Sequence, residues 1–168
     1  GVRGRGGGGG MVWQGGREYW FGGRRGEGGG GNRAWVGVQC DSAENVCEWK
    51  EEGVAMKVSN DPESPITAGC VIERPKVIFN PKTGKFVLWF HLELKGQGYN
   101  AAKTGVAVAD NPTGPYTFLK ALNPNAGVWP VGFPEELKNK TWPEGIKSWS
   151  DEWKEAVKEG MFVKRDFE

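Results

Sequence analysis

The chain has 168 residues, which is enough for one domain that buries roughly 70 % of its unfolded surface. Apolar residues make up 38 % and charged residues 26 %, and the net charge of +1 gives no overall field that would attract nucleic acid or a membrane. No stretch has the roughly 20 apolar residues of a membrane span, and three cysteines without a C-x-x-C pair indicate neither a disulfide framework nor a zinc site.

Four short runs of strand-like composition lie between residues 11 and 57. They are 11–14, 17–21, 34–40 and 53–57. Gly15-Gly16 predicts a two-residue hairpin, because the favoured hairpin turns need positive φ. The glycine-rich stretch 22–31 predicts a loop, and the polar stretch 41–52 predicts a connection.

A second set of four runs follows the same plan. These runs are 76–80, 85–91, 104–109 and 116–119. Asn80–Gly84 predicts the hairpin of this set, and Asn111–Pro115 predicts its last connection. The sets also match residue by residue: Tyr19-Trp20-Phe21 corresponds to Leu88-Trp89-Phe90, and Val36-Gly37-Val38 corresponds to Thr104-Gly105-Val106.

This repeat of four antiparallel strands predicts an all-β fold, a β-propeller of which about two blades are present. We expect blade one at about 8–60, blade two at about 70–120, and an inter-blade loop with a short helix at 121–168, capped by Ser150 and ending near Gly160. A propeller needs at least four blades to close, so we expect this chain to be part of a larger one. An eight-stranded β-sandwich is the alternative.

The segment Ile72-Glu73-Arg74-Pro75 opens the second repeat. The first strand of a propeller blade is the innermost, so its start lies near the mouth of the central channel. A carboxylate there can accept hydrogen bonds or move protons, and a guanidinium offers a rigid fork of donors to sugar hydroxyls. The alternative is a surface ion pair at a strand end.

Side chains alternate along a regular strand, so Glu73 and Arg74 can both face a sugar only if the backbone is irregular there. Pro75 favours such an irregularity, because it removes one ladder donor at the entrance of the strand. We expect Pro75 to hold Arg74 in an extended conformation.

Several motifs in order resemble glycoside hydrolase family 43, in particular its exo-β-1,3-galactanases. The resemblance covers roughly Gly8 to Glu168. The motifs that carry it are Gly8–Gly10, Tyr19–Gly22, Asn32–Val38, Gly69–Ile78, Phe86–His91, Gly105–Val108 and Pro112–Tyr116.

The resemblance implies a five-bladed propeller that hydrolyses glycosidic bonds with inversion. It places Glu73 at an acidic position of the sugar subsite, which we take as the catalytic candidate. It makes Arg74 a sugar-contacting residue beside Glu73, and Tyr99 an aromatic contact with the sugar. The general acid of the family sits in a later blade, so we expect these 168 residues to lack turnover by themselves.

This chain departs from the family pattern at the N-terminal segment. Gly7 stands where the family usually has a histidine, and Gly23 stands where an acidic residue usually follows the aromatic motif. Both family side chains would face the sugar. Asp41-Ser42-Ala43 replaces a pattern closer to Tyr-Ser-Ser.

Other site chemistries find little support. His91 is the only histidine, which excludes an imidazole metal cage. The sequence indicates no Ser-His-Asp or Cys-His arrangement around it, so we expect it to pack or to form hydrogen bonds. Gly6–Gly10 lacks the Lys-Ser/Thr ending of a phosphate loop. We expect no cofactor and no metal, and we interpret Cys40, Cys47 and Cys70 as buried thiols.

The partner expected from the resemblance is an oligo- or polysaccharide, with no nucleic acid and no membrane. The alternative function is a non-catalytic carbohydrate-binding fragment. A third hypothesis treats residues 1–31 as an Arg/Gly-rich RNA-binding arm, but its apolar runs favour strands. We expect an extracellular protein, although no signal peptide is visible, and we expect self-association through the uncovered face of blade two.

Overall fold

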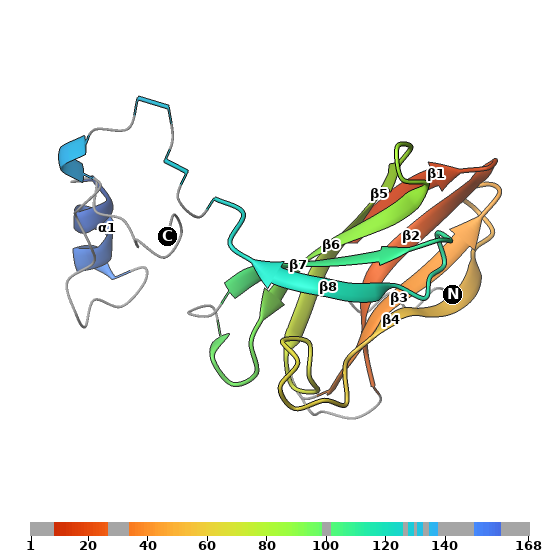
Figure 1. Cartoon of the computed structure of the whole chain (residues 1–168), viewed down its shortest axis with the longest axis horizontal. Coiled ribbons are helices and arrows are strands. Elements are labelled where there is room, and N and C mark those ends of the chain that lie inside the picture. Colours follow the sequence, from red (N-terminus) through yellow and green to blue (C-terminus); the bar gives the residue numbers. More distant parts are fainter. Residues whose placement is uncertain are drawn as a thin grey trace. The chain divides into compact units, whose positions relative to one another are not determined.

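The computed structural model describes residues 9–26, 34–98, 102–125, 128–129, 131–132, 135–137 and 150–158. The chain divides into two units, Gly1–Leu122 and Asn123–Glu168. All the strands in the described ranges belong to the first unit, and they form two four-stranded sheets (Figure 1).

The first sheet follows the chain in the order β1-β2-β3-β4, and every pair is antiparallel. Its strands are β1 Gly10–Gln14, β2 Arg17–Arg25, β3 Trp35–Ala43 and β4 Lys50–Lys57. Gln14 pairs with Arg17, which leaves Gly15 and Gly16 as the turn. Their φ angles of 58° and 80° are those that the type I′ turn requires. The predicted hairpin is therefore confirmed.

The second sheet repeats this topology in the order β5-β6-β7-β8. Its strands are β5 Val71–Asn80, β6 Lys85–Glu93, β7 Ala102–Ala109 and β8 Thr117–Leu122. The β5–β6 turn closes where Asn80 O accepts hydrogen bonds from the backbone N–H groups of Thr83 and Gly84. The two segments that repeat in the sequence thus lie in equivalent strands, β2 with β6 and β3 with β7.

Two predicted connections are shorter than the sequence indicates. β2 continues through the glycines to Arg25, so the loop expected to begin at residue 22 is wrong over residues 22–25. β3 extends to Ala43 and β4 begins at Lys50, so half of 41–52 is strand and the connection is confined to residues 44–49. Gly22 and Gly23 pair with β3, and both positions need glycine because the Trp20 and Trp35 rings occupy the space of a side chain.

The core lies between the two sheets, where both contribute alternate side chains. Its fully buried members include Phe21, Val38 and Cys40 from the first sheet and Ile72, Leu88 and Leu92 from the second. β5 packs against β1, β2 and β3, so it is the strand through which the second sheet meets the first. The loop before β8 adds a backbone hydrogen bond of 2.8 Å from Tyr116 N to Ala55 O in β4.

The order of the strands distinguishes the two predicted architectures. Each sheet is built from four consecutive strands, and the sheets exchange none. Propeller blades have this meander, whereas the sandwiches of the immunoglobulin type use Greek-key connections between sheets. The topology favours blades.

The second unit contains the short helix that the sequence predicts. A 3-10 turn covers Glu135–Leu137, and α1 covers Asp151–Lys158. Ser150 Oγ accepts a hydrogen bond of 3.1 Å from Trp153 N, as an N-cap does, so the predicted cap is confirmed. Within the described ranges, no helix has the length and apolar character needed to cross a bilayer.

Candidate functional site

A β-bulge interrupts β5 at Glu73, the residue where the sequence predicts chemistry. Glu73 pairs with His91 on β6, and the next pair is Lys76 with Trp89. Two residues, Arg74 and Pro75, therefore lie opposite the single residue between His91 and Trp89, which defines a bulge. Proline has no N–H to donate to a strand ladder, so a bulge is one of the few places in a sheet that accept it.

Arg74 has a φ of +51°, the only positive φ among the described residues other than glycine. A residue with a Cβ atom pays about 1–2 kcal/mol for this left-handed conformation. The expected irregularity of the backbone here is confirmed. The expectation that Pro75 holds Arg74 in an extended conformation is wrong, because the bulge turns Arg74 instead. Strained residues of this kind are concentrated at functional sites.

The bulge presents two complementary charges to solvent. Glu73 is half-buried and Arg74 is exposed, whereas Pro75 is fully buried beneath them. In the described part of the chain, no hydrogen bond or ion pair engages the Glu73 or Arg74 side chain. The predicted surface ion pair is therefore not formed, and both groups retain their capacity to bind a polar ligand.

The start of β1, in the first sheet, packs against this bulge. Lys76 Nζ donates a hydrogen bond of 2.7 Å to Gly9 O, just before β1. A Cβ atom on Gly10 would lie 2.7 Å from Pro75 O, and one on Gly9 would lie 2.7 Å from Phe21 O. Such distances are too short for a carbon atom, so glycines are needed where β1 meets the bulge.

Trp35 fills the space beside the segment that leads into the bulge. A Cβ atom on Gly23 would lie 2.2 Å from Trp35 Cζ3 and 3.1 Å from Ile72 O. The indole is 3 % exposed, and the Arg25 guanidinium stacks over it at 4.6 Å. The acidic side chain that the family pattern would place at Gly23 therefore has no room in this chain, because Trp35 occupies its position.

Two further ionisable residues lie next to Glu73 on β6. His91 is the cross-strand partner of Glu73, and its Nε2 lies 3.1 Å from Glu93 Oε1. Glu93 is only 5 % exposed. The expectation that His91 forms hydrogen bonds is confirmed, whereas Glu93 was not predicted as part of the site. A His-x-Glu pattern at the end of the predicted strand 85–91 is the sequence feature that could have indicated it, because residues i and i+2 share a face of a strand.

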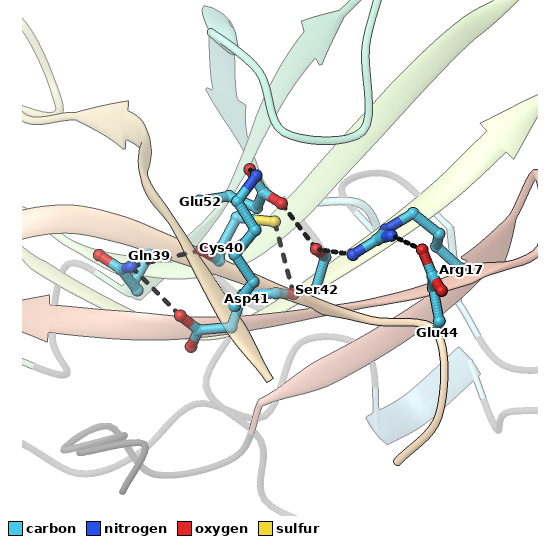
Figure 2. A network of polar contacts seen from close by, with 8 residues as sticks. Arg17, Gln39, Cys40, Asp41, Ser42, Glu44 and Glu52 are labelled. Carbon is cyan, nitrogen blue, oxygen red and sulfur yellow. Dashed lines mark hydrogen bonds and ion pairs between the residues drawn. The ribbon is translucent and has the colours of Figure 1, made fainter. Parts of the chain in front are cut away.

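A second polar cluster lies on β2, β3 and β4 (Figure 2). Ser42 Oγ donates a hydrogen bond of 2.6 Å to Glu52 and accepts one of 3.2 Å from Arg17 Nη2. Gln39 Nε2 donates to Asp41 Oδ1 at 3.4 Å. These side chains satisfy one another. Among the described residues, no group of three or more histidines, cysteines or acids is placed to hold a metal ion.

The two acids of this cluster are perturbed in opposite directions. Burial raises the pKa of Asp41 above its usual value, against the opposing effect of the Gln39 hydrogen bond. The hydrogen bond from Ser42, followed by contributions from Lys50, lowers the pKa of Glu52 despite some burial. Asp41 therefore resists ionisation, and Glu52 favours it.

The cysteines divide into two kinds. Cys40 and Cys70 are buried, as the sequence predicts, and burial raises the pKa of the Cys40 thiol to about 12 and that of Cys70 to about 11. These thiols are unreactive at neutral pH. The prediction of a buried thiol is wrong for Cys47, which is exposed in the turn between β3 and β4.

Of the three predicted site residues, the structure brings Glu73 and Arg74 together at one bulge. Tyr99 lies outside the described residues. The site that can be described therefore consists of a carboxylate and a guanidinium at the start of β5, with His91 and Glu93 beside them on β6.

Three solved structures are similar to this chain. One is a β-1,3-galactosidase of glycoside hydrolase family 43 with galactodeoxynojirimycin, which is 44 % identical in sequence and has a TM-score of 0.79. The match covers 95 % of this chain and 46 % of that chain. A Clostridium thermocellum exo-β-1,3-galactanase has 32 % identity, with 77 % of this chain and 27 % of that chain covered and a TM-score of 0.63. A Phanerochaete chrysosporium exo-β-1,3-galactanase variant with β-1,3-galactotriose has 35 % identity and a TM-score of 0.57, and the match covers 68 % of this chain and 25 % of that chain.

The chain spans less than half the length of each of these relatives. They are five-bladed β-propellers, so the two sheets are two blades of such a propeller. The predicted fold class is confirmed, and the alternative of a β-sandwich is wrong. No family model matches the sequence, and no curated protein matches it.

Proposed function

The chain belongs to glycoside hydrolase family 43, and from this premise we propose that it forms part of the sugar site of a glycosidase that acts on β-1,3-linked galactose. Relatives with the same fold were solved with galactodeoxynojirimycin and with β-1,3-galactotriose. Polymeric galactans lie outside cells, so the proposal includes an extracellular location. Detection of the protein only inside the cells that make it would contradict that location.

One observation carries the proposal: the bulge in β5 presents Glu73 and Arg74 with no hydrogen bond or ion pair from the described residues. An exposed, strained arginine beside a half-buried carboxylate has no structural role that the fold requires. A galactose ring offers several adjacent hydroxyl groups. The guanidinium can donate to two of them at once, and the carboxylate can accept from a third.

We assign different roles to the two side chains. Arg74 binds sugar hydroxyl groups in the ground state and the transition state alike. Glu73 acts mainly in the transition state, either by orienting the attacking water or by raising the proton affinity of the general acid. Tyr99, whose placement is outside the described ranges, is proposed as an aromatic contact with the sugar.

Catalysis with inversion requires an acid and a base whose carboxyl groups lie roughly 6.5–9.5 Å apart, with space for water between them. The carboxylate nearest to Glu73 along the sheet is Glu93, which is buried and engaged by His91. It is poorly placed to act as an acid or a base. We therefore propose that the acid and base come from other blades, and that residues 1–168 alone bind sugar without hydrolysing it.

Assays of β-1,3-galactobiose and of an aryl β-galactoside with residues 1–168 test this proposal. We expect no turnover above a buffer blank, because each missing acid or base is worth about 10²–10⁴-fold. Turnover that Glu73→Gln abolishes would show that the chain is a complete enzyme. Turnover that persists in Glu73→Gln would place the chemistry elsewhere.

The role of Glu73 is tested in a protein that carries this chain together with the remaining blades. We expect Glu73→Gln to lower kcat far more than it raises KM, because an interaction made chiefly in the transition state appears in kcat. An unchanged kcat would make Glu73 a binding residue only. Glu63→Gln, an exposed acid in the loop before β5, is the matched control.

A further inference from the structure

Glu73, His91 and Glu93 lie on one face of the second sheet. Ile72 pairs with Leu92, and both are fully buried in the core between the sheets. Side chains alternate along a strand, so the neighbouring pair, Glu73 with His91, points to the opposite face. Glu93 is two residues beyond His91 and shares that face. Glu73 is thus paired with His91 and lies diagonally across the two strands from the buried Glu93.

The contact with Glu93 determines how the His91 ring is held. A carboxylate without a proton only accepts hydrogen bonds, so with Glu93 in that form His91 Nε2 is the donor in the 3.1 Å contact. In the neutral ring this fixes the tautomer and leaves Nδ1 as an acceptor. Glu93 is 5 % exposed, so it is held firmly and has little freedom to find another partner.

His91 has one partner on each of the two neighbouring strands. On β7 the residue paired with His91 is Thr104, and on β5 the residue paired with it is Glu73. β5 carries two cations close to Glu73: Arg74, which is adjacent to it, and Lys76, whose Nζ donates to Gly9 O. Among the residues that the structure describes, Glu73 and Glu93 are therefore the acids that face His91 from β5 and β6.

We propose that His91 is a positioning residue for Glu73, and that the buried Glu93 holds the His91 ring for this purpose. Cross-strand side chains are separated by about 4.5–5.5 Å at their Cβ atoms, so the ring limits the rotamers open to the Glu73 carboxyl. The carboxyl is then held toward the bulge, next to Arg74. This inference deepens the proposed function and rests on Glu73 being a sugar ligand.

The chain offers a clean spectroscopic test, because His91 is its only histidine. Nitrogen-15 spectra of the ring report its tautomer directly. We expect the Nε2–H form in the free protein and a mixture of tautomers in Glu93→Leu, which removes the acceptor and keeps an apolar side chain of similar size. We also expect Glu73→Gln to shift the ring nitrogen signals. A residue with a purely structural role would show no response to Glu73→Gln.

A double-mutant cycle on galactose affinity then measures whether His91 acts through Glu73. We expect His91→Phe, which keeps a ring for packing, to weaken galactose binding about fivefold, a change within the usual range for coupled neighbours. In the Glu73→Gln background, the same substitution should have no further effect. His91→Gln, which can still donate to Glu93, should retain more affinity than His91→Phe and serves if the phenylalanine variant fails to fold.

The outcomes separate this inference from the proposed function. If wild-type protein binds no galactose, the proposed function fails, while the response of the ring nitrogens to Glu73→Gln still decides whether His91 contacts Glu73. If galactose binds, two results would overturn the inference. One is that the His91 ring nitrogen signals do not change in Glu73→Gln, and the other is that His91→Phe lowers galactose affinity equally in wild-type protein and in Glu73→Gln.

Discussion

Lys76 Nζ is hydrogen-bonded to the carbonyl oxygen of Gly9 at 2.7 Å, so the residue that closes the bulge of the second blade holds the entry to the first strand of the first blade. The contact joins two segments 67 residues apart in the sequence. Together with the close approach of Gly10 to Pro75 O, it makes the bulge dependent on the junction between the blades.

Gly10→Ala should therefore destabilise the junction. The new Cβ atom would lie 2.7 Å from a backbone oxygen, which cannot move as a flexible side chain would. We expect the free energy of unfolding to fall by about 1–3 kcal/mol, as for other overpacked sites, measured by urea denaturation. Gly26→Ala is the matched control, because its Cβ atom would meet only ordinary contacts at 3.7 Å. Equal stability of the two variants would contradict the account.

Arg74→Gly should stabilise the protein while it weakens sugar binding. Glycine relieves about 1–2 kcal/mol of strain in the left-handed conformation. It also loses more conformational entropy on folding, which costs about 0.5–1 kcal/mol. We expect a net gain of about 0.5 kcal/mol in urea denaturation, whereas Arg74→Ala should show no such gain because its φ remains strained. A loss of stability in Arg74→Gly would mean that the guanidinium supports the fold and is not reserved for a ligand.

Asp41 and Glu52 should affect the pH dependence of stability with opposite signs. The pKa of Asp41 is raised from 3.8 in the folded state, so the folded state is relatively favoured at low pH and loses stability as Asp41 ionises on raising the pH. Asp41→Asn should raise the free energy of unfolding at pH 7 and change it little at pH 3.

The pKa of Glu52 is lowered from 4.5, so its contribution is present above that pH and is lost as the pH falls. Glu52→Gln should therefore lower the melting temperature at pH 7 and have little effect at pH 3. Melting curves of both variants at the two pH values test the pair together. Shifts of the same sign in both variants at pH 7 would refute the assignment.

The uncovered face of the second blade should cause self-association. Ile78 is 59 % exposed and Trp89 37 % exposed, and the strand register places both on the face opposite the core. We expect Ile78→Lys to reduce association in sedimentation velocity. Val46→Lys, at a 62 % exposed position in the β3–β4 turn, is the control and should not. A compact monomer of wild-type protein at tens of micromolar would contradict this prediction.

The strands and turns of the first unit are largely predictable, because short stretches of sequence determine them. Gly15-Gly16 and Asn80–Gly84 specify tight turns whatever surrounds them, and the four-strand repeat on either side specifies the blade. The extent of β2 is not predictable in this way. Gly22 and Gly23 have the composition of a loop, and only the tertiary positions of Trp20 and Trp35 explain why this strand has glycine at both positions.

The site follows the same division. Glu73 and Arg74 could be found from the motif, and Pro75 indicated an irregular strand. The positive φ of Arg74 could not be found, because it results from the register shift against β6. The role of Glu93 could not be predicted, because the sequence does not show whether an acidic residue is buried. Its burial depends on the packing of the second blade.

Galactose binding by residues 1–168 tests the central claim most directly. In isothermal titration calorimetry with galactose and β-1,3-galactobiose, we expect wild-type protein and Glu63→Gln to bind equally. Glu73→Gln and Arg74→Gly should each bind at least about tenfold more weakly, as expected for the loss of a hydrogen bond to a charged group. Equal affinity in all four proteins, or no binding by the wild type, would contradict a sugar site at the bulge of β5.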